Sequence, residues 1–179
     1  MAEQHVRSAN PRTVRYVLAD CSLGRVLLAA TEQGVVALYM GDTDAPLEEA
    51  LRQVHPTAAK AGADSPSFRA WLKKVDSYLS GSTLALDLPL DVTGTAFQRR
   101  VWQELQAIPP GCTRSYGEIA RQVGRPSAAR AVARACATNQ VSLVIPCHRV
   151  IREGGQLGGY RWGLDRKRRL LDQEQAVHL

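Results

Sequence analysis

Residues 115–137 read SYGEIARQVGRPSAARAVARACA, and their pattern indicates how the second half of the chain folds. Ser115 and Glu118 have the S-x-x-E spacing of a capping box, which predicts that a short helix begins at this point. Gly124-Arg125-Pro126 then breaks the helix, and Ser127 is expected to cap a second helix that runs to the end of the stretch. Two helices joined by a short turn that contains glycine predict a helix-turn-helix.

The second helix of this stretch combines small side chains with two arginines. Residues 127–136 contain five alanines, and Arg130 and Arg134 are four positions apart, which places them on one face. A helix packed in the core is the alternative, and it would explain three positions: Ala131, Val132 and Ala135. Because arginines are seldom fully buried, the pattern favours a helix that faces nucleic acid.

The positive charge of the chain is concentrated in the same half. The 179 residues carry 23 Lys and Arg against 17 Asp and Glu, a formal net charge of +6. Residues 1–90 hold 9 basic and 10 acidic side chains, a net −1, whereas residues 91–179 hold 14 and 7, a net +7. This asymmetry indicates a polyanionic partner for the second half alone, although solvated basic surfaces are also common.

Composition and cysteine usage exclude several classes of protein. With 45% hydrophobic residues the chain can form one domain or two small ones with a real core. No apolar run approaches the roughly 18 residues of a membrane span, and the first residues lack the pattern of a signal peptide. The four cysteines form no C-x-x-C pair and have no histidine at metal-ligand spacing. We therefore expect a cytoplasmic protein with free thiols, no metal and no membrane contact.

The first half predicts a small sheet with two helices. Three β-rich runs separated by turns predict strands at 13–18, 25–31 and 35–40. Apolar stripes at helical spacing predict one helix from Asp44 and another from Ser65, with a loop at 55–64 between them. Residues 84–88 are expected to form a short strand, and residues 89–94 the joint between two domains. No residue of this half stands in a pattern that indicates chemistry.

A reactive segment follows the helix-turn-helix at residues 139–150, NQVSLVIPCHRV. It places a thiol, an imidazole and a guanidinium at consecutive positions from Cys147, and a thiolate is an effective nucleophile beside a base or a cation. In an extended segment neighbouring side chains point to opposite sides, so we expect a water relay between Cys147 and His148 rather than a direct hydrogen bond. A carboxylate typically orients such an imidazole, and three are candidates: Asp165, Asp172 and Glu174.

This segment resembles the PCHRV signature of the O6-alkylguanine-DNA alkyltransferases, the methylated-DNA–protein-cysteine methyltransferases. Asn139 stands eight residues before the cysteine, as it does in that family. Three further stretches are similar to family motifs: TRSYGEIA at 113–120, RAV at 130–132 and GGYRWG at 158–163. The resemblance covers roughly residues 13–175 and is nearest to the C-terminal domain of bacterial Ada proteins.

The resemblance implies an α/β (α+β) fold, with a small N-terminal RNase-H-like α/β domain followed by a C-terminal winged helix-turn-helix domain. The expected boundaries are a flexible N-terminus at 1–12, the α/β domain at 13–90 and the DNA-binding, alkyl-accepting domain at 91–179. The implied activity is DNA repair by direct reversal. A methyl or larger alkyl group would move irreversibly from O6 of guanine in double-stranded DNA, with O4 of thymine as a further candidate, to Cys147 after base flipping. A monomer without a cofactor is expected.

The resemblance also implies roles for individual residues. Cys147 would accept the alkyl group, His148 would take its proton through a water, and Glu174 would orient the imidazole. Tyr116 would assist the departure of guanine, and Asn139 would tie the turn after the recognition helix to the reactive segment. Substrate contacts are implied for Tyr160, Val150, Arg161 and Lys167. DNA contacts are implied for Arg130, Arg134, Ser127 and Ala129, with the first of these filling the gap that the flipped nucleotide leaves.

Three alternatives stand beside this interpretation. A non-catalytic protein that binds DNA damage would share the fold, but Cys147 and Glu174 argue against it. A transcription regulator would use the helix-turn-helix, but no module like those that precede this region in Ada is expected. A cysteine hydrolase would leave the basic half unused. Arg161 stands where some family members carry serine, which leaves the tolerance for bulky alkyl groups open, and the other three cysteines are expected to be structural: Cys21, Cys112 and Cys136.

Overall fold

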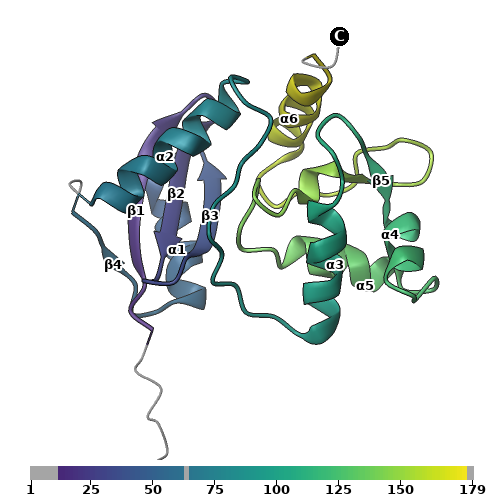
Figure 1. Ribbon diagram of the computed structural model, residues 1–179, viewed down its shortest axis with the longest axis horizontal. Coiled ribbons are helices and arrows are strands. Elements are labelled where there is room, and N and C mark those ends of the chain that lie inside the picture. Colours follow the sequence, from purple (N-terminus) through teal and green to yellow (C-terminus); the bar gives the residue numbers. More distant parts are fainter. Residues whose placement is uncertain (1–11, 63–64, 177–179) are drawn as a thin grey trace, which may run out of the picture.

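The computed structural model describes residues 12–62 and 65–176. In the first half, four strands form one sheet in the order β3-β2-β1-β4 (Figure 1). The strands span Arg15–Cys21 (β1), Gly24–Ala30 (β2), Val35–Gly41 (β3) and Ala59–Lys60 (β4). β2 pairs antiparallel with β1 and with β3, whereas β4 is parallel to β1. The three strands that the sequence predicts are confirmed.

Both faces of this sheet are buried. Alternate side chains of β2 belong to two cores, because successive residues of a strand point to opposite faces. Val26 and Leu28 pack on the side of α2, whereas Leu27 and Ala29 pack on the side of α1. The helices span Asp44–Val54 (α1) and Pro66–Leu79 (α2). Figure 1 shows them on opposite faces of the sheet, and both predicted helix starts are confirmed.

Two predictions for the first half are wrong. Residues 55–64 are more than a loop, because the two residues of β4 pair with the start of β1. Residues 84–88 form no strand, and the chain makes a single bridge at Leu90 instead, to Val35 of β3. Such short pairings depend on neighbours far away in the sequence rather than on local pattern. The flexible N-terminus predicted at 1–12 lies outside the described residues except for Arg12, whose guanidinium pairs with Asp91 at 2.9 Å.

The second half is mainly helical. Its elements are α3 (Ala96–Gln106), β5 (Arg114–Ser115), α4 (Tyr116–Gln122), α5 (Ala129–Ala137), the 3-10 turn η1 (Cys147–Arg149), β6 (Val150–Ile151) and α6 (Leu164–Ala176). β5 and β6 pair in parallel, and in Figure 1 α4 and α5 lie on the side of the molecule away from the four-stranded sheet. The predicted fold class is confirmed, while the domain boundaries stay a prediction. Within residues 12–62 and 65–176, no helix has the length and apolarity that a membrane span needs.

The helix-turn-helix begins as the sequence predicts, but its second helix starts differently. The Ser115 hydroxyl accepts a hydrogen bond from Glu118 N at 3.1 Å, and the Glu118 carboxylate accepts one from Ser115 N at 2.6 Å, so the capping box is present. Ser127 does not cap α5, because the residue at the cap is Ala128, which has no side-chain acceptor. A turn hydrogen bond from Ala128 N to Arg125 O, 2.9 Å long, carries the chain one residue further before the helix starts.

Backbone and side-chain contacts join the two halves. Leu38 N, in β3, donates to Gln140 O at 2.8 Å, and Leu38 O accepts from Ser142 N at 3.3 Å. The segment after α5 therefore continues the edge of the N-terminal sheet. Beside it, the rings of Tyr39 and Trp162 pack with their centroids 4.8 Å apart. Both halves thus hold the segment that leads to Cys147.

Candidate active site

Cys147 begins a short 3-10 turn, so the extended geometry on which the predicted water relay rests is not the geometry of this segment. Pro146 leads into this turn rather than into a strand, and Cys147 is only 8% exposed. The sulfur accepts a hydrogen bond from Nδ2 of Asn139 at 3.3 Å. The thiol is therefore held at a defined position within the second half.

Asn139 shapes the loop that carries this thiol. Its Nδ2 also donates to Ile145 O at 2.8 Å, and its Oδ1 accepts from Val141 N at 2.9 Å. With every polar group of the amide used, the side chain fixes the path of the chain between α5 and Cys147. This is the placement that the role predicted for Asn139 needs.

Of the three candidate carboxylates, Glu174 is the one that meets the imidazole. Its Oε1 lies 2.9 Å from Nε2 of His148, and both side chains are fully buried. Asp165 and Asp172 lie on the same helix but are exposed. Because an ionised carboxylate only accepts, the ring proton resides on Nε2. The other ring nitrogen, Nδ1, has no hydrogen-bond partner within the described residues, so it is the nitrogen that can accept a proton.

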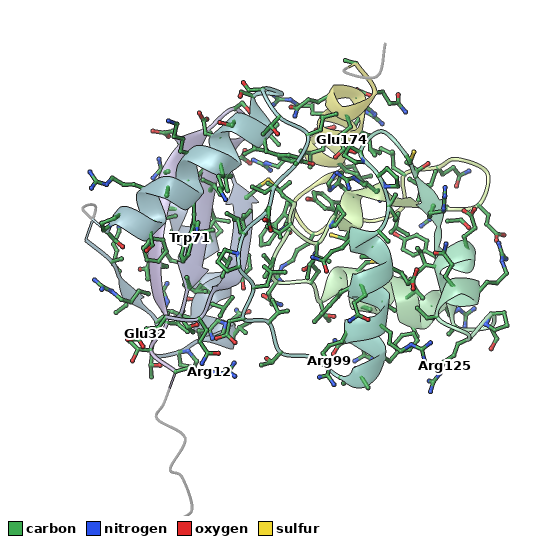
Figure 2. All side chains as sticks on the ribbon, in the orientation of Figure 1. Arg12, Glu32, Trp71, Arg99, Arg125 and Glu174 are labelled. Atoms are coloured by element: carbon green, nitrogen blue, oxygen red, sulfur yellow. The ribbon has the colours of Figure 1, made fainter. Side chains whose placement is uncertain are left out.

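Three further groups that the sequence analysis did not assign converge on Glu174. Arg149 donates from Nη2 to Oε1 at 2.8 Å and from Nε to Oε2 at 3.0 Å. Tyr78 donates from Oη to Oε1 at 2.6 Å, and Gly111 N donates to Oε2 at 3.1 Å. Figure 2 shows Glu174 on α6, near the junction of the two halves. Arg149 could have been found from its place beside Cys147 and His148, whereas Tyr78 has no local signal.

These contacts set the charges of the pair. Burial alone would raise the pKa of Glu174, but the hydrogen bonds from His148 and Arg149 outweigh it and hold that pKa well below its ordinary value. Burial lowers the pKa of His148, with Arg149 and Lys167 adding to the effect and Glu174 opposing it. At neutral pH the carboxylate is ionised, and the imidazole is uncharged and able to take a proton.

The thiol itself needs such a base. Burial raises the pKa of Cys147, although Asn139 and Lys167 favour the thiolate, so the resting group is a thiol. Lys167 Nζ donates to Val150 O at 2.6 Å, to Gly159 O at 3.3 Å and to Leu157 O. Burial lowers the pKa of Lys167 to about 8, and the charged form donates to the three carbonyls. Lys167 is therefore mainly charged at neutral pH and lies near the sulfur.

Cys147 lines a pocket of about 280 Å³. The walls come from the start of α4, from α5 and from the loop after β6: Tyr116, Ala133, Cys136, Ala137, Gly159, Tyr160 and Arg161. Burial raises the pKa of Tyr116 to about 12, so its hydroxyl is a hydrogen-bond donor at neutral pH. Cys136, which the sequence analysis treats as structural, forms part of the pocket wall. The pocket can therefore admit a planar group and present it to a thiol and a phenol.

The exposed face of α5 carries the two predicted arginines. Arg130 and Arg134 are exposed, and their side chains have no partner in the part of the chain that the structure describes. Ala129, the first residue of this helix, is half-buried, and Ser127, in the turn before it, is exposed. A core helix would explain three positions. Val132 and Ala135 are buried, as that alternative expects, whereas Ala131 is exposed. Because α5 also lines the pocket, it connects a cationic face to Cys147.

The residues predicted to contact substrate divide into two groups. Two line the pocket, Tyr160 and Arg161, and two do not, Val150 and Lys167. The guanidinium of Arg161 stacks 4.8 Å from the ring centroid of Trp162 and 5.1 Å from that of Tyr39. Since Tyr39 belongs to β3, the first half supports one edge of the pocket.

Family comparisons agree with this geometry. The model of the 6-O-methylguanine DNA methyltransferase, ribonuclease-like domain matches residues 14–92, and that of the 6-O-methylguanine DNA methyltransferase, DNA binding domain matches residues 96–176. Together these two matches cover nearly the whole described chain.

Two curated relatives show how much of the chain is shared. The chain is 48% identical over 173 residues to the bifunctional transcriptional activator/DNA repair enzyme Ada of Escherichia coli K12, a match that covers 97% of this chain and 49% of that protein. It thus spans about half the length of that relative. It is 49% identical over 156 residues to the methylated-DNA–protein-cysteine methyltransferase of Mycobacterium leprae, which covers 87% of this chain and 89% of that protein.

Solved structures resemble the whole fold. The crystal structure of Mycobacterium tuberculosis O6-methylguanine methyltransferase matches with a TM-score of 0.79 at 38% identity, over 92% of this chain and 94% of that one. The structure of Mycobacterium tuberculosis OGT in complex with DNA matches with a TM-score of 0.75 at 38% identity, over 92% and 93%. By its sequence, its two domains and its fold, the chain belongs to the 6-O-methylguanine DNA methyltransferase family.

Proposed function

We propose that this chain repairs double-stranded DNA by moving a methyl or larger alkyl group from O6 of guanine to Sγ of Cys147. One observation carries the proposal: the pocket that contains Cys147 is lined by α5, whose exposed face presents Arg130 and Arg134. The names of the relatives, which describe a DNA repair enzyme and a methylated-DNA–protein-cysteine methyltransferase, support the same reaction.

The nucleotide has to leave the duplex before it can react. O6 of guanine lies inside the base stack, and a thiol at the wall of a pocket cannot approach it there. Flipping the nucleotide costs a few kcal/mol, and an inserted side chain offsets part of this cost by filling the gap. Arg130 is suited to that role because it is exposed on the helix that borders the pocket. Arg134, Ser127 and Ala129 would contact the backbone nearby.

The reaction forms one S–C bond and breaks one C–O bond. The proton of the Cys147 thiol passes through a water to Nδ1 of His148, and Glu174 stabilises the imidazolium that results. The sulfur attacks the alkyl carbon, and the electron pair of the C–O bond stays on guanine. The Tyr116 hydroxyl donates a hydrogen bond that stabilises the departing base. The product is a thioether, which water does not readily cleave, so each molecule acts once.

The remaining expectations belong to the same proposal. Double-stranded DNA is the partner, bound by a monomer through contacts that are mainly to phosphates. The reaction needs no cofactor, because the damaged base itself supplies the alkyl group. A cytoplasmic location and activity on O4-methylthymine stay predictions.

The proposal is tested by following a labelled methyl group. The protein is incubated with duplex DNA that carries one O6-methylguanine with a labelled methyl carbon. We expect the label to appear on Cys147, with at most one methyl per chain. Cys147→Ala should abolish transfer while largely retaining DNA binding. The matched control is Cys112→Ala, which removes an exposed thiol outside the pocket and should leave transfer unchanged.

Two outcomes would overturn the proposal. Label released as methanol would indicate a hydrolase instead of a transferase. Label left on the DNA by protein that binds the duplex tightly would indicate a non-catalytic damage-binding protein.

A further inference from the structure

The first half of the chain supplies a side chain to the buried pair behind the thiol. We infer that Tyr78, in α2, is a positioning residue for the alkyl transfer. Acting through Glu174, its hydroxyl holds the imidazole of His148 in the orientation and tautomer that accept the proton of Cys147. This inference rests on the proposed function, since it concerns the same reacting centre.

Tyr78 is held at both of its ends. The residue is 1% exposed, and its hydroxyl lies 2.6 Å from Oε1 of Glu174 and 3.4 Å from Nε2 of His148. Its backbone carbonyl accepts a hydrogen bond from Nε2 of Gln173 at 2.6 Å, which joins the end of α2 to α6. The phenol therefore reaches the carboxylate from a fixed base, with little freedom to move away.

The direction of these hydrogen bonds follows from the charge of the carboxylate. An ionised Glu174 only accepts, so the Tyr78 hydroxyl donates to Oε1 and cannot use the same proton toward His148. Burial, and next the negative charge of Glu174, raise the pKa of Tyr78, so the hydroxyl keeps its proton at any working pH. Oε1 thus accepts from Tyr78, from Nε2 of His148 and from Arg149 at once. Three donors fix this oxygen, and the fixed oxygen orients the imidazole.

Removing the hydroxyl should change the basicity of His148 in a known direction. With one donor fewer, the carboxylate becomes a stronger acceptor for Nε2–H, which favours the imidazolium and raises the pKa of His148. The other groups near the imidazole stay in place: Lys167 on α6, and Arg149 and Cys147 on its own turn. Since only the neutral imidazole can take the thiol proton, the acidic limb of the pH–rate profile should move to higher pH.

The test compares Tyr78→Phe with the wild-type chain. The rate of single-turnover methyl transfer from duplex O6-methylguanine is measured against pH, and each rate is taken per molecule that has accepted a methyl at completion. Phe keeps the ring, so the variant tests the hydroxyl alone. Misfolded protein does not affect the rate, because molecules that accept no methyl are not counted. We expect a roughly tenfold slower transfer at neutral pH, the size of one hydrogen bond to a charged group, together with the shifted acidic limb.

The matched control removes a similar hydrogen bond elsewhere in the first half. Tyr16 donates to Oε1 of Glu48 at 2.9 Å, on the sheet and away from the site. Tyr16→Phe should keep the wild-type rate and profile. A Tyr78→Phe protein that behaves like this control would overturn the inference. If the wild-type chain itself transfers no methyl group, the proposed function fails instead.

A double-variant cycle tests whether Tyr78 acts through Glu174. In a Glu174→Gln background the carboxylate that Tyr78 orients is gone, so adding Tyr78→Phe should cause little further loss of rate. A second, independent tenfold loss in that background would contradict the inference, because Tyr78 would then act by another route.

Discussion

The two halves of the chain differ in where they keep their polar side chains. In the first half, ion pairs lie at the surface, as between Arg52 and Glu49, which are 3.2 Å apart with both side chains more than half exposed. In the second half, polar and charged residues are buried: Ser115, Asn139, Ser142, His148, Arg149, Lys167 and Glu174. Within the described residues, no other charged, hydroxyl or amide residue is buried to this degree, and the first half adds the buried phenols of Tyr39 and Tyr78, which both bond to the second half. Burying such groups is costly unless they are paired, so their clustering marks the half that carries the chemistry.

The comparison also shows what the first half contributes. Its sheet edge binds the backbone on both sides of Val141 through Leu38, its Tyr39 supports Arg161, and its Tyr78 reaches Glu174. The first half thus acts as a scaffold that fixes the position of groups which belong to the second. Substitutions in the two halves should therefore have effects that differ in kind.

The largest effect is expected from Glu174→Gln. This change removes the charge that balances Arg149, whose guanidinium would remain buried without a counter-ion. Breaking one side of a buried pair costs about 3–5 kcal/mol, and we expect a loss of this size in the free energy of unfolding, measured with urea. Glu49→Gln in the first half breaks only an exposed pair and should cost less than about 0.5 kcal/mol. Equal losses in the two variants would contradict the division between the halves.

A smaller effect is expected when pH replaces mutation. Burial lowers the pKa of His148, so unfolding takes up a proton below the unfolded value of about 6.5, and stability falls as the pH drops through this range. The folded-state pKa of Glu174 is also lowered, so its stabilisation is present above the unfolded value of about 4.3 and is lost as the pH falls toward the folded value. We expect a loss of roughly 2 kcal/mol between pH 7 and pH 4 in the free energy of unfolding.

The Glu174→Gln protein provides the control for this pH dependence. It lacks the carboxylate, so its stability should fall less steeply below about pH 4.3, and the difference between the two proteins should narrow there. If the difference in free energy of unfolding between the two proteins stays constant down to pH 3, protonation of Glu174 is not coupled to unfolding.

How much of this arrangement the sequence predicts depends on distance along the chain. Patterns of neighbouring residues are predictable from sequence. They include the strands β1 to β3, the capping box at Ser115 and the adjacent pair of Cys147 and His148. The choice of Glu174 among three carboxylates required the resemblance, because it depends on how α6 packs. Tyr78 lies 96 residues from Glu174, and no local pattern records that contact.

The wrong expectations have the same physical origin. Ser127 has the side chain of a helix cap, but the turn hydrogen bond between Ala128 and Arg125 moves the cap to a residue that cannot use it. An extended Cys147 segment is the premise for the predicted water relay, yet Asn139 binds the carbonyl of Ile145 and the chain continues into a 3-10 turn. In both places a hydrogen bond between residues a few positions apart in the sequence overrides the conformation that the residues themselves favour.

Arg130→Ala separates DNA handling from folding. An exposed arginine without a partner contributes little to stability, so the free energy of unfolding should change by less than about 0.5 kcal/mol. If Arg130 fills the gap left by the flipped nucleotide, transfer from duplex DNA should slow by about tenfold, while transfer from free O6-methylguanine base should not change. Arg69→Ala, which removes an exposed arginine of α2, is the control and should leave both rates unchanged. Equal slowing on both substrates would assign Arg130 a structural role.

The smallest effect is expected at the contact that joins the halves, where Arg161 stacks on Tyr39 and Trp162. Arg161→Lys keeps the positive charge but loses the planar group that stacks, and exposed cation–π contacts contribute about 0.5–1 kcal/mol. Arg125→Lys removes a similar contact with Phe97, which lies wholly inside the second half. We expect the two variants to lose similar amounts of global stability.

The two variants should differ in where the structure loosens. Leu38 N donates to Gln140 O and Ser142 N to Leu38 O, and these two amides report on the backbone contact between the halves. Their hydrogen exchange should accelerate in Arg161→Lys by a few-fold, in keeping with a loss of about 0.5–1 kcal/mol, and should not change in Arg125→Lys. Arg161 also donates from Nη1 to Oε1 of Gln140 at 3.2 Å, so a difference at these amides reports the combined loss of the stacking and of this hydrogen bond where the halves meet. Equal hydrogen-exchange rates at these amides in the two proteins would mean that the backbone contact of Leu38 does not depend on the stacking of Arg161.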